Sequence, residues 1–246
     1  AGKETTSSTL ALENLSIAPV LAALGYPALD TVISGRANGR LFGEDPEGAF
    51  SLSAVSAVSG VSTALDLSLN GHLDRSAMTF TGQSAYGPDL KANAAGRLPV
   101  IASPAGLVRP DPDQAIEALL DISGDLKALR LIALAYGHDI GGKLTSRTRL
   151  SGTIAQPLVE ANADITGGIY EYGATGLRLK DLDLQIRYDR RVLHIAGSGA
   201  GTGGGTLTFD GRLAEGGTGI DLNLDRILIY DRLADQARIT GNAKLT

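Results

Sequence analysis

The sequence predicts an all-β protein, built on a long antiparallel sheet with one or two short helices. Two observations carry this prediction. Apolar and polar residues alternate with a period of two along most of the chain, and clusters of Gly, Asn, Asp and Ser separate the alternating stretches. A period of two places the apolar side chains on one face of a strand, and the separating clusters supply the residues that turns favour. We therefore expect a meander in which each strand pairs with the next.

Four stretches predict strands with one apolar and one polar face. In chain order they are Leu65–Leu69, Ile116–Ile122, Leu182–Ile186 and Leu222–Leu224. Three dipeptides have residue types that hairpin turns favour, namely Asn70-Gly71, Asp210-Gly211 and Gly216-Gly217. Apolar residues at helical spacing are confined to two short stretches, Ile17–Leu24 and Leu126–Leu134, which predict the helices.

An internal repeat predicts how the chain is organised. Each helical stretch is followed by a turn containing Tyr and Gly, and then by a strand. This strand includes Arg40–Gly43 after the first helical stretch and Arg149–Gly152 after the second. We expect residues 1–246 to form one continuous fragment of two head-to-tail units, about residues 1–112 and 113–246. The Pro-rich stretch Pro99–Pro112 is expected as the irregular connection between them. Stacked units of this kind share one continuous core.

The composition excludes several classes of protein. Glycine accounts for 32 of the 246 residues, but without the three-residue period of collagen, and 43% apolar residues argue against intrinsic disorder. The net charge of −5 argues against a nucleic-acid partner, which needs a basic surface. Without cysteine the chain has no disulfide, no catalytic thiol and no cysteine-ligated zinc. No apolar run approaches the ~18 residues of a transmembrane helix.

No stretch has the residue spacing of a catalytic or metal site. The glycine-rich run Gly197–Thr206 lies between two strand patterns and contains no lysine, which favours a turn or bulge over a phosphate loop. The three histidines lack the spacing of metal ligands: His72, His138 and His194. The carboxylates of Asp181 and Asp183 are expected on the solvated face of their strand. We therefore expect no enzyme activity, no catalytic residue, no metal and no cofactor.

Arginines gather around Tyr188-Asp189, where the pattern predicts a hairpin tip. They are Arg187, Arg190 and Arg191. A solvated turn is the favoured interpretation, and contact with anionic headgroups or with a partner is the alternative.

Motifs in the second half of the chain occur in a recognisable order. They are Gly152–Pro157, Gly168–Tyr172, Gly176–Leu184, the glycine-rich Ala196–Thr206 and Leu207–Leu213. This order resembles the TamB C-terminal domain family, a component of the translocation and assembly module of the Gram-negative envelope with AsmA-like relatives. The resemblance covers Leu150–Leu213, about a quarter of the chain.

The resemblance implies a sheet curled into an open, U-shaped β-taco groove with an apolar concave face. It implies a periplasmic segment of an inner-membrane-anchored protein that shields phospholipid acyl chains during transport between the two membranes, or supports outer-membrane protein assembly and secretion. A TamA-type outer-membrane barrel is the implied protein partner, through segments outside this chain. The family is anchored by an N-terminal helix, which we expect to lie outside this sequence.

The residues expected to line the groove are the apolar positions of the alternating strands. They are Leu65, Leu67, Leu69, Leu120, Ile122, Leu177, Leu179, Leu182, Leu184, Ile186, Leu193, Ile195, Leu207, Phe209, Leu222 and Leu224. The same positions would form the interior of a closed β-sandwich, which is the structural alternative. Two functional alternatives stay open: a scaffold that offers free strand edges to outer-membrane proteins without carrying lipid, and a secreted β-solenoid passenger.

Overall fold

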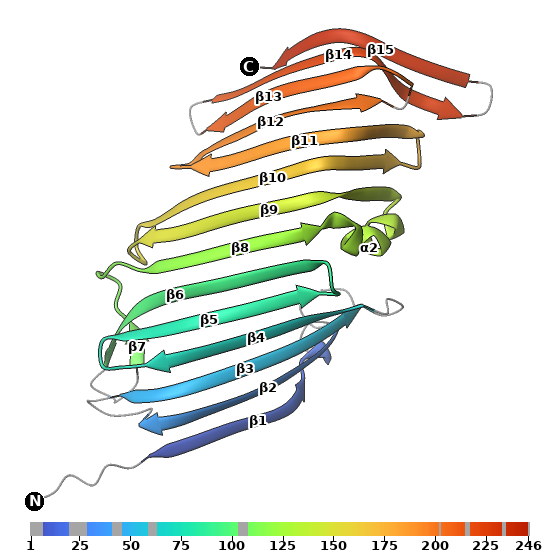
Figure 1. The fold of residues 1–246 in the computed structure, drawn as a ribbon. Coiled ribbons are helices and arrows are strands. Elements are labelled where there is room, and N and C mark those ends of the chain that lie inside the picture. Colours follow the sequence, from blue (N-terminus) through green and yellow to red (C-terminus); the bar gives the residue numbers. More distant parts are fainter. Residues whose placement is uncertain are drawn as a thin grey trace, which may run out of the picture. The chain divides into compact units, whose positions relative to one another are not determined.

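The computed structural model describes residues 7–19, 29–40, 46–58, 63–102, 108–201, 203–214, 217–232 and 235–245. These residues confirm the predicted all-β class. The strands pair in chain order in an open antiparallel sheet, and only β7 leaves this path, by pairing with β6 (Figure 1). Each described hairpin therefore joins strands that are neighbours both in the chain and in the sheet.

The strands vary in length from three residues to sixteen. Their bounds are β1 Ser8–Ser16, β2 Leu29–Arg40, β3 Glu47–Val58, β4 Ala64–Leu73, β5 Ala77–Tyr86, β6 Leu90–Ala102, β7 Val108–Pro110, β8 Glu117–Asp125, β9 His138–Gly152, β10 Pro157–Tyr172, β11 Leu177–Asp189, β12 Val192–Gly201, β13 Thr206–Ala214, β14 Gly217–Arg232 and β15 Asp235–Leu245.

The chain divides into two units. Unit 1 comprises Ala1–Leu120 and Arg149–Leu158, and unit 2 comprises Asp121–Thr148 and Val159–Thr246. Strands β8, β9 and β10 contribute residues to both units. The internal sequence repeat stays a prediction.

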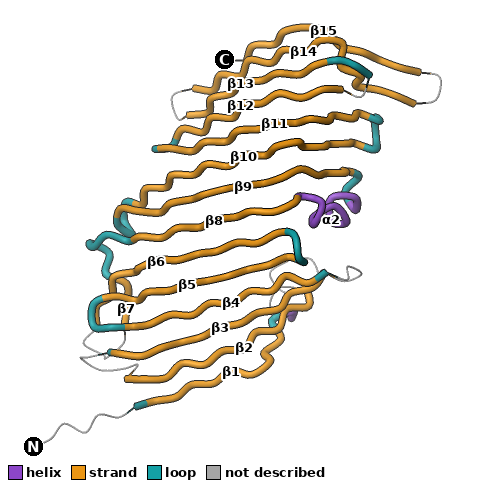
Figure 2. Tube along the Cα trace, viewed as in Figure 1, coloured by secondary structure: helices purple, strands orange, loops and turns teal. Residues whose placement is uncertain are grey.

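The predicted helix over Leu126–Leu134 is confirmed as a 3₁₀ turn, η1 (Leu126–Leu129), followed by helix α2 (Arg130–Ala135) (Figure 2). Asp125 caps η1, because its Oδ1 accepts a hydrogen bond from Lys127 N at 2.9 Å. The other predicted helix, Ile17–Leu24, lies mostly outside the described residues.

Two of the predicted turns are wrong. Asn70-Gly71 lies inside β4 and Asp210-Gly211 lies inside β13. The turn after β4 is instead built by Asp74, whose Oδ1 accepts hydrogen bonds from Ser76 N at 2.7 Å and Ala77 N at 2.8 Å. These backbone hydrogen bonds lower the pKa of the Asp74 carboxyl. The third predicted turn, Gly216-Gly217, falls partly outside the described residues.

A β-bulge in β11 keeps its leucines on one side of the sheet. Leu177 and Leu179 occupy odd positions, whereas Leu182 and Leu184 occupy even ones, so a regular strand would point them to opposite sides. The register shifts between Lys180 and Asp183, and Asp181 takes a left-handed φ of 52°. The extra residue of the bulge shifts the alternation by one position, so that these four leucines point to the same side of the sheet.

Few apolar side chains of the described residues are buried. They are Pro46, Ala77, Tyr86, Pro99, Val100, Ile116, Leu182, Ile227 and Leu228.

Candidate functional site

In unit 1, cross-strand pairing aligns the side chains of six strands, β1 to β6, in rows. Residues directly opposite each other on paired strands point to the same side of a sheet. One row runs Leu10, Ala37, Phe50, Gly71, Phe80 and Gly96, and the next runs Leu12, Gly35, Leu52, Leu69, Gly82 and Ala94. Leu67 and Leu65 continue the same side of β4.

Part of this side of unit 1 is hollowed. A pocket of about 310 Å³ lies over β1 to β4, and Leu10, Leu12, Phe50, Leu52 and Leu69 are among the residues that line it.

In unit 2, the pairing of β10 to β15 aligns a second set of rows. One runs Ile165, Leu184, Gly197, Phe209, Leu222 and Ala243, and the next runs Ala163, Ile186, Ile195, Gly211 and Ile220. A third row contains Gly199, Leu207 and Leu224. A fourth row contains Tyr188, Leu193 and Leu213. We call the side that carries these rows in each unit the leucine side.

The three described phenylalanines each cover a glycine on the neighbouring strand. A Cβ atom on Gly71 would lie under 3 Å from the ring of Phe50, and one on Gly96 would meet the ring of Phe80 in the same way. In unit 2, a Cβ atom on Gly197 would lie 2.8 Å from Phe209 and 2.6 Å from Leu184. Glycines inside these strands thus leave room for large side chains of the next strand, a role that the sequence analysis did not identify.

The sixteen residues predicted to line a groove are not packed like the interior of a sandwich. Only Leu182 is buried, at 8% exposure, and Leu65, Leu67 and Leu120 are exposed at 41%, 39% and 37%. The other twelve are half-buried. In β11 to β14 the register brings nine of them together on the leucine side of unit 2: Leu182, Leu184, Ile186, Leu193, Ile195, Leu207, Phe209, Leu222 and Leu224.

The remaining predicted residues lie in three other places. Leu177 and Leu179 are on the leucine side of β11, opposite Tyr172 and Tyr170. Leu65, Leu67 and Leu69 lie on the leucine side of unit 1. In β8, Leu120 belongs to unit 1 and Ile122 to unit 2.

Aromatic rings gather where β10 ends and β11 begins. The ring of His138 stacks on Tyr170 and Tyr172, with centroid distances of 5.8 and 5.0 Å, and its Nδ1 lies 3.0 Å from Tyr170 Oη. Tyr136, just after helix α2, is 73% exposed. The sequence analysis missed this cluster, although the paired Tyr170 and Tyr172 at a strand end were a visible signal.

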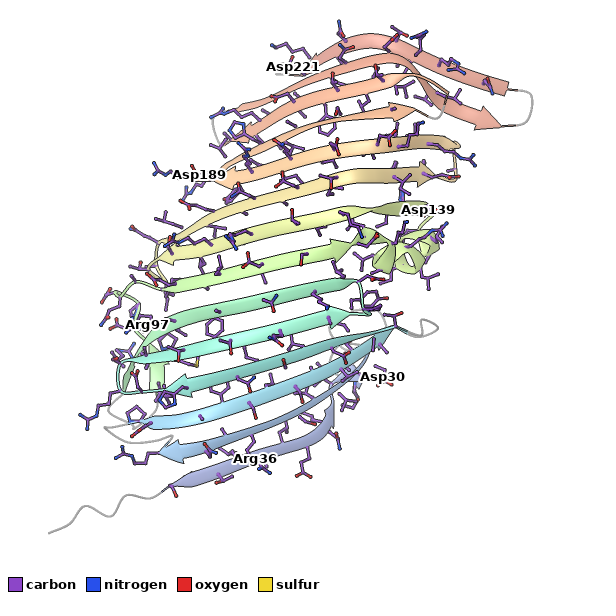
Figure 3. All side chains as sticks on the ribbon, in the orientation of Figure 1. Asp30, Arg36, Arg97, Asp139, Asp189 and Asp221 are labelled. Carbon is purple, nitrogen blue, oxygen red and sulfur yellow. The ribbon has the colours of Figure 1, made fainter. Side chains whose placement is uncertain are left out.

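Charged side chains of β8 and β9 pair across the sheet. Arg147 contacts Asp121 at 2.6 Å and Lys143 contacts Asp125 at 3.1 Å. The backbone N–H of Lys127, followed by the Lys143 ammonium, lowers the pKa of Asp125. Arg130 holds Asp139 by two hydrogen bonds of 2.6 and 2.7 Å, which lower the pKa of that carboxyl; Asp139 lies beside α2 in Figure 3. These exposed pairs contribute little stability individually.

The described residues hold no group of three or more His, Asp and Glu side chains able to bind a metal ion. His194 is exposed, opposite Arg187 and Arg212. Asp181 and Asp183 are also exposed, and Asp183 Oδ1 accepts a hydrogen bond from Gly167 N at 3.1 Å. Within the same part of the chain, no helix has the length and apolar character to cross a membrane.

The described residues of the glycine-rich run Gly197–Thr206, all but Thr202, form the end of β12, a turn and the first residue of β13, in agreement with the predicted turn. Gly201 N donates to Gly205 O at 2.8 Å, and Gly204 takes a left-handed φ of 89°. Arg238 Nη1 donates to Gly203 O at 2.8 Å. A Cβ atom on Gly205 would lie 2.5 Å from Asp225 O, so the backbone of β14 passes directly against this turn.

Comparison of the chain with models of protein families, with curated proteins and with solved structures gave no match.

Proposed function

We propose that this chain is a periplasmic segment of a TamB-like envelope protein that shields phospholipid acyl chains on its leucine side. In this proposal the leucine rows of each unit form an apolar, concave face of a U-shaped groove. The groove carries phospholipid between the inner and outer membranes and supports outer-membrane protein assembly and secretion. A TamA-type barrel would be met by segments outside this chain.

The observation that carries the proposal is the exposure of the leucine rows. Burying one leucine side chain stabilises a protein by about 1.5–3 kcal/mol. The chain gains only part of this energy, because twelve of the sixteen predicted positions are half-buried and three are exposed. A bound acyl chain would supply the missing burial, at about 0.8 kcal/mol for each CH₂ group removed from water.

The chemistry of the rows also suits an acyl chain. Leu, Ile, Ala and Gly are the most frequent residues in the rows. The rows of unit 2 contain no charged residue. A saturated chain makes no hydrogen bonds, so an aliphatic lining without directional contacts is sufficient for it. The motif order between Leu150 and Leu213, which resembles the TamB C-terminal family, points to the same ligand.

An exposed strand edge supports a second candidate function, that of a scaffold for outer-membrane proteins. Among the described residues, β1 pairs only with β2, and its Leu10, Leu12 and Leu15 are 56%, 39% and 48% exposed. A client strand could add to such an edge by backbone hydrogen bonds.

Native mass spectrometry of the purified chain, with extraction and analysis of bound lipid, tests the first candidate. We expect adducts with the mass of phospholipids, released by organic extraction and restored when phospholipid is added back. A monodisperse, lipid-free protein that takes up no added phospholipid would contradict the proposal and favour the scaffold.

A further inference from the structure

Tyr86, the last residue of β5, is buried, but its hydroxyl group has no hydrogen-bond partner. The residue is 7% exposed, and within the described part of the chain its Oη atom makes no hydrogen bond. A buried tyrosine hydroxyl usually has such a partner. An unpaired buried donor costs free energy, because the group has lost its hydrogen bonds to water. The chain alone therefore leaves a donor that an acceptor on a ligand would satisfy.

The strand register places Tyr86 on the leucine side of unit 1. Tyr86 is directly opposite Leu65 on β4, and Leu65 is directly opposite Ser56 on β3. Leu65 is 41% exposed, so this row is open to a ligand between its two hydroxyl-bearing residues.

Further hydroxyl groups lie on the same side, around Leu65 and Leu67. Thr31 is opposite Ser56 and is also 7% exposed, and the two hydroxyl oxygens are 2.7 Å apart. One proton makes this hydrogen bond, so the pair keeps a second proton that it can donate. Ser84 is opposite Leu67 in the next row. Hydroxyl groups thus surround these two exposed leucines.

Along β4 the leucine side then becomes purely apolar. The rows that contain Leu69 and Gly71 consist only of Leu, Phe, Ala and Gly, and both contribute residues to the pocket of about 310 Å³. Four residues, or about 13 Å of extended strand, separate Leu65 from Leu69. The acyl region of one bilayer leaflet is about 15 Å thick, half of the hydrocarbon core. Polarity along β4 therefore changes as it does along a phospholipid, from the ester groups to the acyl chain.

We propose that the Tyr86 hydroxyl donates a hydrogen bond to an ester carbonyl of a phospholipid whose acyl chain lies over Leu69 and in the adjoining pocket. An ester carbonyl accepts hydrogen bonds and donates none, which matches a hydroxyl donor at the end of an apolar surface. The site therefore distinguishes ester-linked chains from ether-linked chains, which have no carbonyl. This inference rests on the proposed function, because the apolar rows hold the acyl chain.

The test compares ester-linked phosphatidylglycerol with its ether-linked analogue of the same chain length. The wild type should bind the ester lipid about tenfold more tightly, because only the ester accepts the hydrogen bond from Tyr86. Tyr86→Phe removes this hydroxyl alone, so it should abolish the preference and leave the affinity for the ether lipid unchanged. Without lipid, the melting temperature of this variant should equal or exceed that of the wild type, since the unpaired donor is gone.

The matched control is Tyr136→Phe, which removes a hydroxyl from a residue that is 73% exposed and should keep the preference. Binding is measured by titration in detergent and by native mass spectrometry, which counts each bound lipid separately. If the wild type binds both lipids equally, or if Tyr86→Phe keeps the preference, the Tyr86 site is wrong while the proposed function stands. A lower melting temperature of the lipid-free Tyr86→Phe variant would show that the hydroxyl already has a partner, which also overturns the site. If the wild type binds neither lipid, the proposed function itself fails.

Discussion

Gly205→Ala is expected to destabilise unit 2 by about 3 kcal/mol, which is at the upper end of the cost of forcing extra atoms into a packed site. The new Cβ atom would meet backbone atoms of Asp225 and Arg226. Backbone cannot rotate away as the end of a side chain can, so β13 and β14 must separate locally. The loss is measured as a lower urea midpoint, with faster hydrogen exchange of the amides in β13 and β14.

The matched control is Gly219→Ala, because nothing lies within 4 Å of the position that its Cβ would take. Alanine is also favoured over glycine inside a strand by about 0.5–1 kcal/mol. This variant should therefore be as stable as the wild type or slightly more stable. Equal behaviour of the two alanine variants would show that β14 does not pass closely against the β12–β13 turn.

Leu67→Asp is expected to weaken phospholipid binding at least about tenfold while unit 1 stays folded. Leu67 lies on the leucine side of β4 and is 39% exposed, so its replacement costs the protein only part of the burial of a core leucine. A carboxylate against an acyl chain would have to be desolvated or would displace the chain. Binding is measured by native mass spectrometry, and folding by circular dichroism.

Ser68→Asp is the control for this substitution, because the next residue of a strand points to the other side of the sheet. Ser68 pairs with Ser53 and Gln83, well inside the same strands. Lipid binding should be unchanged in this variant. Unfolding of the Leu67→Asp variant would instead indicate that the leucine side is a closed core.

The fold class followed from residue periodicity because alternation over several strands is a strong, local signal. Leu65–Leu69 and Leu182–Ile186 lie in β4 and β11 as expected, and the 126–134 stretch is helical. The Arg187–Arg191 region forms a hairpin tip as predicted, although its turn residues are not those that such turns favour.

The turns and bulges were less predictable because they depend on contacts between strands. Asn70-Gly71 has the residue types that hairpin turns favour. Gly71 nevertheless lies inside β4, where the ring of Phe50 leaves no room for a Cβ atom. In the sequence, the bulge at Asp181 corresponds only to a change of the leucines from odd to even positions, between Leu179 and Leu182. Cross-strand register, which defines the candidate site, cannot be read from any single strand.

The central claim, that acyl chains lie on the leucine side, is tested most directly by photo-crosslinking. The probe is a phospholipid with a photoreactive group at the end of one acyl chain, and labelled peptides are mapped by mass spectrometry. We predict labels on row residues such as Leu52, Leu69 and Leu222. Labels on residues of the opposite side, such as Ser68 and Asp183, or no labelling of a folded protein, would contradict the claim.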